Sequence, residues 1–123
     1  MTKTVSESAL DAIDVRHFHY FSVVAEENSL RRAAERLFMA QPPLSRQIKQ
    51  LEERLGVTLF VRHSKGLTLT DEGARVLAIV RPLLQMKDAT YRRLRADIHP
   101  QEQRPRIGFT TAFEQGVFAG LER

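Results

Sequence analysis

Residues 41–55 read Gln-Pro-Pro-Leu-Ser-Arg-Gln-Ile-Lys-Gln-Leu-Glu-Glu-Arg-Leu. Two prolines suit the first turn of a helix, where backbone N–H groups have no partner anyway, so they mark a helix start near residue 41. Four apolar side chains then recur on one narrow stripe: Leu44, Ile48, Leu51 and Leu55. The opposite side carries Arg46 and Lys49 near the positive end of the helix dipole. We predict a helix over residues 41–54 whose first half suits phosphate groups and base edges.

Two shorter helices are expected before it. Apolar residues recur at three- and four-residue steps in the first, which we place at about Val15 to Glu27: Phe18, Phe21, Val24 and Ala25. Ser29 is a good N-cap for the second, from Leu30 to Phe38. One face of this second helix carries Leu30, Ala33, Ala34 and Leu37. Its two alanines allow another helix to cross closely.

After Gly56 the apolar residues alternate instead of following a helical period. Leu59 and Val61, then Leu67 and Leu69, flank the segment Arg-His-Ser-Lys-Gly at residues 62–66, which indicates a short hairpin with a basic tip. Two helices joined by a tight turn and followed by such a hairpin form a winged helix-turn-helix. The predicted fold class is therefore mainly α, with three helices plus a two-stranded wing over residues 15–70.

A long helix is predicted over residues 71–98, after Thr70 as N-cap. Seven residues along it follow alternating steps of three and four: Leu77, Val80, Leu84, Lys87, Tyr91, Leu94 and Ile98. Such a heptad seam predicts a partner helix, which makes this a linker helix that dimerises. The alternative is that the seam packs on its own domain. Pro82 lies off the seam and should kink the helix.

Charge and composition narrow the classes of function. The net charge is +4, and residues 31–65 carry eight basic and three acidic groups, or +5. A basic block inside a patterned segment favours a polyanion as partner, although a solvated charged face remains the alternative. The chain has no cysteine, and its four histidines show no metal-ligand spacing. No motif of an enzyme is present, so we expect neither catalysis, nor a metal, nor a cofactor.

Several motifs in this order resemble the N-terminal DNA-binding domain of LysR-type transcriptional regulators, over about Val15 to Ile98: Arg16–Phe21, Ala33–Leu37, Gln41–Ile48, Leu51–Glu52, Leu55–Val57 and Leu69–Gly73. The sequence of residues 41–48 is similar to that of the family branch that regulates aromatic-compound catabolism. Many members have serine where this chain has Ala40, which can neither cap the helix nor offer a hydroxyl to phosphate.

The resemblance implies which residues meet DNA. The helix at residues 41–54 is then the recognition helix, and its groove-facing part carries Gln41, Pro42, Pro43, Ser45 and Arg46, with Lys49 beside them. The chemistry agrees, because glutamine can pair with adenine, arginine can fork onto guanine, and proline rings can pack on thymine methyl groups. The expected phosphate contacts are Arg31, Arg32 and Arg62, and Lys65 is placed to enter the minor groove. For each basic residue the alternative is a solvent-exposed charge.

The resemblance also sets expectations for the whole molecule. It implies a homodimer, joined through the linker helix, on an interrupted inverted repeat in a double-stranded operator, and a tetramer for the full-length regulator. Residues 1–14 lack the basic start and apolar run of a signal peptide, so we expect a cytoplasmic location. We expect a flexible leader at residues 1–14, a hinge at 99–105 and the truncated start of an effector-binding domain at 106–123, the missing remainder of which would bind a small-molecule effector. No stretch is long and apolar enough for a membrane span. The alternatives are a non-specific nucleoid-type DNA binder and a dimerisation or protein-interaction module.

Overall fold

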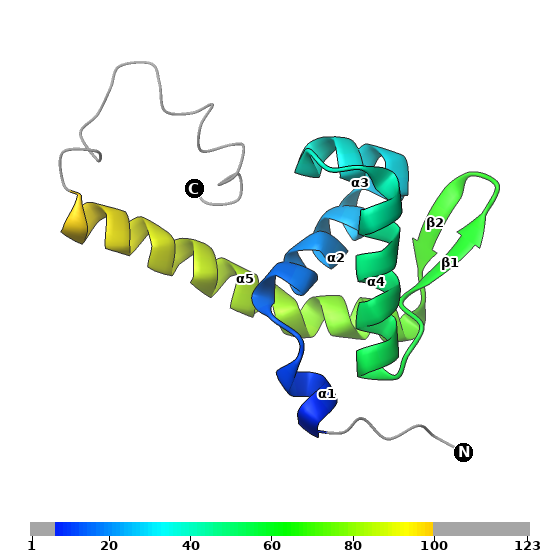
Figure 1. Ribbon diagram of the computed structural model, residues 1–123, viewed down its shortest axis with the longest axis horizontal. Helices are drawn as coiled ribbons and strands as arrows, with labels where there is room; N and C mark the ends of the chain where they lie inside the picture. The colour runs from blue at the N-terminus through cyan, green and yellow to red at the C-terminus, as the bar shows by residue number, and fades with distance from the viewer. Residues whose placement is uncertain (1–6, 100–123) are drawn as a thin grey trace. The chain divides into compact units, whose positions relative to one another are not determined.

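The computed structural model describes residues 7–99 of the chain (Figure 1). Its elements, in chain order, are α1 (Glu7–Asp11), α2 (Val15–Glu27), α3 (Leu30–Leu37), α4 (Gln41–Leu55), β1 (Phe60–His63), β2 (Gly66–Leu69) and α5 (Asp71–Ile98). From α2 onward, three helices, a two-stranded antiparallel wing and a long helix follow one another as the sequence predicts, and the predicted fold class is confirmed. No helix among these described residues has the length and hydropathy to cross a bilayer.

The core forms where α2 packs on α3 and α4, and where α3 packs on α4. Its largest fully buried side chains come from α2, α4 and the segment before the wing: Phe21, Val24, Leu44, Leu51 and Leu59. The Phe21 and Phe60 rings lie edge to face, with 5.6 Å between their centroids, which joins the wing to the helical core. The two alanines predicted to permit a close helix crossing, Ala33 and Ala34, are both buried.

Side chains cap the N-terminal ends of α2 and α3, whereas the N-terminal end of α4 has no side-chain cap. The Ser29 hydroxyl accepts a hydrogen bond from the Arg32 backbone N–H at 3.1 Å and caps α3 as predicted. The Asp14 carboxylate caps α2, and the buried His17 Nδ1 accepts the Asp14 N–H in return at 3.0 Å. At the start of α4, Ala40 makes no side-chain cap, so the following prolines, which lack N–H groups, reduce the number of donors left without a partner.

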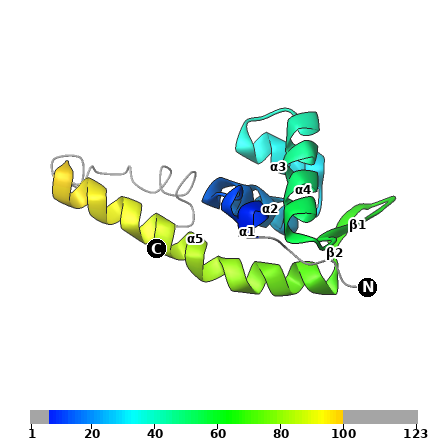
Figure 2. The ribbon, with the colours of Figure 1, turned by 60° about the horizontal axis from the view of Figure 1, so that its bottom comes forward.

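The wing is a tight hairpin in which Phe60 pairs with Leu69 and His63 pairs with Gly66. It projects beyond the helices beside α4 (Figure 2). Gly66 has a φ of 130°, and a Cβ atom there would collide with the carbonyl oxygen of Asn28. The glycine is therefore required both by the backbone conformation and by the close approach of the wing to the α2–α3 turn.

The long helix α5 begins after Thr70, whose hydroxyl accepts the Gly73 N–H at 2.8 Å as the predicted N-cap. It runs through Pro82 without interruption, and the chain divides into two units at this point, one up to Arg81 and one from Pro82 onward. In the first unit, Leu77 and Val80 are 7% and 6% exposed in the single chain. These two side chains already pack in their own unit, which is the alternative left open above, and so they offer little surface to a partner.

In the second unit the described part of α5 shows apolar side chains to solvent. Tyr91, Leu94 and Ile98 of the predicted seam are 48%, 49% and 61% exposed. Leu84 is partly buried, while Leu83 and Met86, which the seam did not include, are 41% and 65% exposed. The apolar surface of this segment is therefore broader than the predicted seam.

The predicted leader, residues 1–14, contains the short helix α1 at Glu7–Asp11, which the sequence did not predict. This helix packs against α4, and the Arg54 guanidinium donates a hydrogen bond to the carbonyl of Ala12 at 3.1 Å. A helix of five residues is too short to show a helical period in the sequence. The contact with Arg54, 42 positions from Ala12, cannot be predicted from neighbouring residues. Residues 1–6 of the leader, the hinge after His99 and the segment 106–123 lie outside the described residues.

Candidate nucleic-acid interface

The outward face of α4 presents most of the predicted base-reading residues to solvent. Gln41, Pro42, Arg46 and Lys49 are exposed, while Pro43 and Ser45 are half-buried. Within residues 7–99, neither Arg46 nor Lys49 forms an ion pair, so both cations are available to an anionic partner. The backbone N–H groups and dipole of the same helix end add positive potential at this place.

The wing lies close to this face and contributes a second group of cations. The Arg62 guanidinium, on β1, donates to the Ser45 hydroxyl on α4 at 3.3 Å. A hollow of about 100 Å³ opens between α4 and the wing, and its lining includes Ser45, Lys49 and Arg62. The structure therefore brings together three predicted contact residues from two elements.

Lys65 occupies the two-residue turn at the wing tip and is exposed. Its backbone N–H donates to His63 Nδ1 at 3.3 Å, and His63 Nε2 lies 2.6 Å from the Thr68 hydroxyl across the hairpin. These contacts use the backbone of Lys65 and leave its ammonium group at the tip. His63 thereby supports the shape of the turn.

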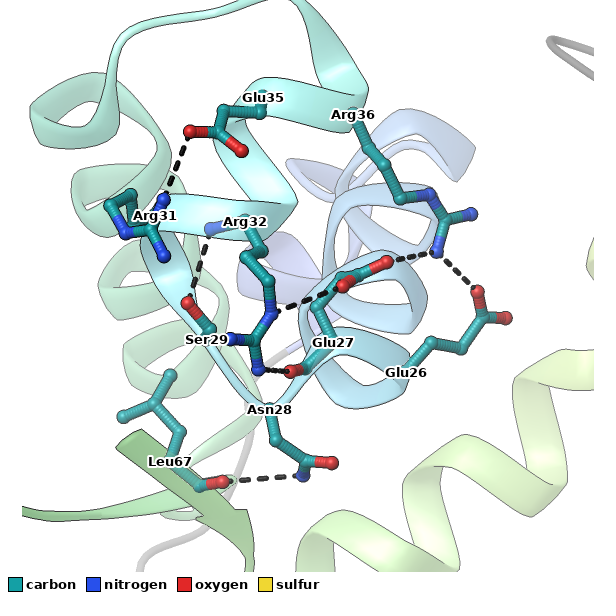
Figure 3. Close-up of polar contacts among 9 residues, drawn as sticks. All are labelled: Glu26, Glu27, Asn28, Ser29, Arg31, Arg32, Glu35, Arg36 and Leu67. Atoms are coloured by element: carbon teal, nitrogen blue, oxygen red, sulfur yellow. Dashed lines mark hydrogen bonds and ion pairs between the residues drawn. The ribbon is translucent and has the colours of Figure 1, made fainter. Parts of the chain in front are cut away.

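Arg31 and Arg32 lie on α3, and both have partners within the protein (Figure 3). Arg31 pairs with Glu35 one turn later at 3.1 Å. The Arg32 guanidinium donates to the backbone carbonyl of Glu27 at 2.8 Å and lies 3.5 Å from the Glu27 carboxylate. Arg32 therefore links α3 to the end of α2, a role that its predicted phosphate contact did not include.

Arg36 extends the same network. Its Nη1 atom lies 2.8 Å from a Glu26 oxygen and 3.0 Å from a Glu27 oxygen (Figure 3). Partial burial would lower the pKa of Arg36, but its hydrogen bonds to the two carboxylates and their attraction outweigh this and leave the pKa raised. The network joins α2 to α3 by ion pairs that are each weak, because their side chains are partly exposed.

The comparisons with known proteins agree with this geometry. The family model described as "Bacterial regulatory helix-turn-helix protein, lysR family" matches residues 15–74. The transcriptional regulator BudR of Klebsiella aerogenes is 37% identical over 109 residues, which cover 87% of this chain and 76% of BudR. The chain belongs to the LysR family.

Other LysR relatives are longer. The probable cat1 operon transcriptional activator of Acinetobacter lwoffii is 41% identical over 115 residues, which cover 90% of this chain and 37% of that protein. BsdA of Bacillus subtilis is 41% identical over 108 residues, or 35% of its length. The chain thus spans a little over a third of the length of these two relatives.

Two solved structures of LysR DNA-binding domains in complex with DNA have the same fold. The BenM domain bound to catB site 1 DNA is 36% identical, covers 76% of this chain and 100% of its own, and has a TM-score of 0.65. The CbnR domain bound to DNA is 37% identical, covers 70% of this chain and 99% of its own, and has a TM-score of 0.63.

Two residues at this interface are not among those predicted from the sequence. Glu52 on α4 and Asn28 in the α2–α3 turn both hydrogen-bond to the wing. Both partners are backbone groups, which carry no residue-type signal. The left-handed Asn28, with a φ of 53°, is typical of a helix end, but its side-chain contact 39 positions away is visible only in the fold.

Proposed function

We propose that this chain is the sequence-specific DNA-binding part of a bacterial LysR-type transcription regulator. The observation that carries the proposal is the exposed first half of α4, where Arg46 and Lys49 have no ion pair within residues 7–99 and the basic wing lies beside them. An exposed helix start of this kind fits the major groove. Two LysR DNA-binding domains with this fold have been solved in complex with DNA, which supports DNA as the partner.

Within this proposal the site residues divide into two groups. The first group occupies the start of α4 and meets base edges: Gln41, Pro42, Pro43, Ser45 and Arg46, with Lys49 beside them. Arg31, Arg32, Arg62 and Lys65 fix the register on the sugar-phosphate backbone, with Lys65 at the minor groove. Arg31 and Arg32 must share this task with their contacts to Glu35 and Glu27.

The proposed functional unit is a homodimer. Leu84, Tyr91, Leu94 and Ile98 meet the same helix of a second copy, and three of these four side chains are about half exposed or more in the single chain. Two recognition helices then occupy successive major grooves of an interrupted inverted repeat. The full-length regulator is a cytoplasmic tetramer that binds a small-molecule effector through a domain beyond this chain, in the branch that controls aromatic-compound catabolism. The proposal assigns no enzymatic activity to the chain.

Selection of bound sites from a random duplex pool, at near-physiological salt, tests the proposal, with the stoichiometry of the complex measured in parallel. We expect enrichment of an inverted repeat bound by two chains. Recovery of unrelated sequences would instead indicate non-specific binding to the DNA backbone. Absence of binding even at low salt would indicate a protein-interaction module and refute the proposal.

A further inference from the structure

The base of the wing is held to α4 by one carboxylate. Glu52 Oε2 accepts a hydrogen bond from the Leu59 N–H at 2.8 Å and lies 3.3 Å from the Phe60 N–H as a second donor. These residues lie immediately before and at the start of β1. A charged acceptor shared by two backbone donors forms a stronger contact than a neutral one.

A second contact holds the other strand. The Asn28 carbonyl accepts the Leu67 N–H at 3.1 Å, and its side-chain amide donates to the Leu67 carbonyl at 3.2 Å. Gly66 packs so closely on Asn28 that no Cβ atom fits. The wing is therefore attached on the β2 side to the α2–α3 turn and on the β1 side to α4, through Glu52 at its base and through the exposed Arg62–Ser45 contact farther along the strand.

The position of Glu52 is costly for a protein that binds a polyanion. Its side chain lines the same hollow as Lys49 and Arg62, so a negative charge lies among the cations that face DNA. A carboxylate there opposes phosphate binding unless it serves another purpose. The two backbone N–H groups that it accepts are the purpose that the structure shows.

We propose that Glu52 is a positioning residue that sets where the wing tip meets the DNA backbone, an inference that rests on the proposed function. The arm from Phe60 to His63 has four residues. At about 3.3 Å per residue it is roughly 13 Å long, so a tilt of about 10° at its base moves the tip by roughly 2 Å. That displacement breaks a hydrogen bond or ion pair between Lys65 and a phosphate.

A matched pair of variants isolates the acceptor from the charge. Glu52→Gln and Glu52→Met both remove one negative charge and have similar volumes, but only glutamine retains an oxygen that can accept the two N–H groups. Each is combined with Lys65→Ala, and affinity for a labelled duplex is measured over a salt series by fluorescence anisotropy. We expect Lys65→Ala to reduce the salt slope by about one unit in the wild-type and Glu52→Gln backgrounds. In the Glu52→Met background we expect the same substitution to change neither slope nor affinity.

Further variants cover the remaining outcomes. Glu53→Gln, the exposed neighbour, changes the same charge and should leave the Lys65 effect intact. Glu52→Asp keeps the charge but is one methylene shorter, so its carboxylate should no longer reach the two N–H groups and the variant should behave like Glu52→Met. If thermal melts show that Glu52→Met is unfolded, Glu52→Asp takes its place as the acceptor-loss variant. An unchanged Lys65 effect in the folded acceptor-loss variant overturns the inference, as does the absence of any Lys65 effect in wild type. If wild type binds no duplex at any salt, the proposed function itself fails.

Discussion

Two arginine substitutions separate base reading from stabilisation of the fold. Arg46 is exposed on α4 and forms no ion pair in the described part of the chain. Arg32 on α3, in contrast, donates to the Glu27 carbonyl at 2.8 Å and is 51% exposed. We therefore expect Arg46→Ala to alter sequence preference and Arg32→Ala to alter mainly the free energy of unfolding.

The expected size of the Arg46→Ala effect follows from its proposed contact. A bidentate arginine–guanine pair contributes about 1–3 kcal/mol of discrimination between bases. At about 1.4 kcal/mol per tenfold change, preference at one base pair should fall by about 5- to 140-fold. Because Arg46 has no partner among the described residues, the free energy of unfolding should stay within about 0.5 kcal/mol of wild type.

The Arg32→Ala effect is worked from two lost contacts with Glu27. A surface ion pair contributes about 0.2–1 kcal/mol, and a hydrogen bond contributes about 0.5–1.5 kcal/mol. Because Arg32 is 51% exposed, we take the lower part of both ranges. A loss of about 1 kcal/mol lowers Tm by roughly 4–8 °C in a domain of this size. Below the melting range, any loss of affinity should be about equal for all sequences.

Thermal melts followed by circular dichroism give the stability, and anisotropy titrations give the affinity. Each variant is titrated with the duplex recovered by selection and with duplexes that differ from it by one base pair. The reasoning is refuted if both variants lose affinity without a change of preference. It is also refuted if Arg46→Ala lowers Tm as much as Arg32→Ala does.

Three further predictions concern stability and assembly. Phe38 is 94% exposed with a φ of 55°, so Phe38→Asn should raise the free energy of unfolding by about 0.5–1 kcal/mol in a denaturant titration, whereas Phe38→Ala, which keeps the backbone penalty, should not. Gly66→Ala should lower the free energy of unfolding by more than about 1 kcal/mol, and therefore the Tm, because its methyl group meets the Asn28 carbonyl; an unchanged melt would contradict this. Leu94→Arg should shift the sedimentation coefficient from dimer to monomer, while Ala96→Arg on another face should not; equal shifts would argue against the proposed seam.

Features encoded in neighbouring residues could be predicted from the sequence. The spacing of apolar residues in α2 and α4 gave helix limits that match the structure within one residue. Ser29 and Thr70 were expected as caps, and their hydroxyls accept the N–H groups three residues later. Periodicity and capping depend on neighbouring residues, so one amino-acid sequence contains enough information to predict them without comparison to other sequences.

Contacts between distant residues could not be predicted in the same way. Arg32 was expected to reach phosphate because its charge and helix position were visible, but its partner at the end of α2 was not. Nothing in the sequence around Glu52 indicates a distant partner, yet its carboxylate accepts backbone N–H groups at the base of the wing. Backbone groups are the same at every residue, so only the folded geometry shows which of them a side chain meets.

The heptad seam shows how one sequence pattern can serve two kinds of packing. A residue that is already buried cannot gain further hydrophobic stabilisation by association, because that stabilisation depends on the area removed from water. Leu77 and Val80 are in that position, whereas Leu94 and Ile98 keep about half or more of their surface exposed. If the helix pairs with a second copy, its association energy must come from the part after Pro82. Substitutions at Leu77 and Val80 should then lower the stability of the monomer, while those at Leu94 and Ile98 should weaken the dimer.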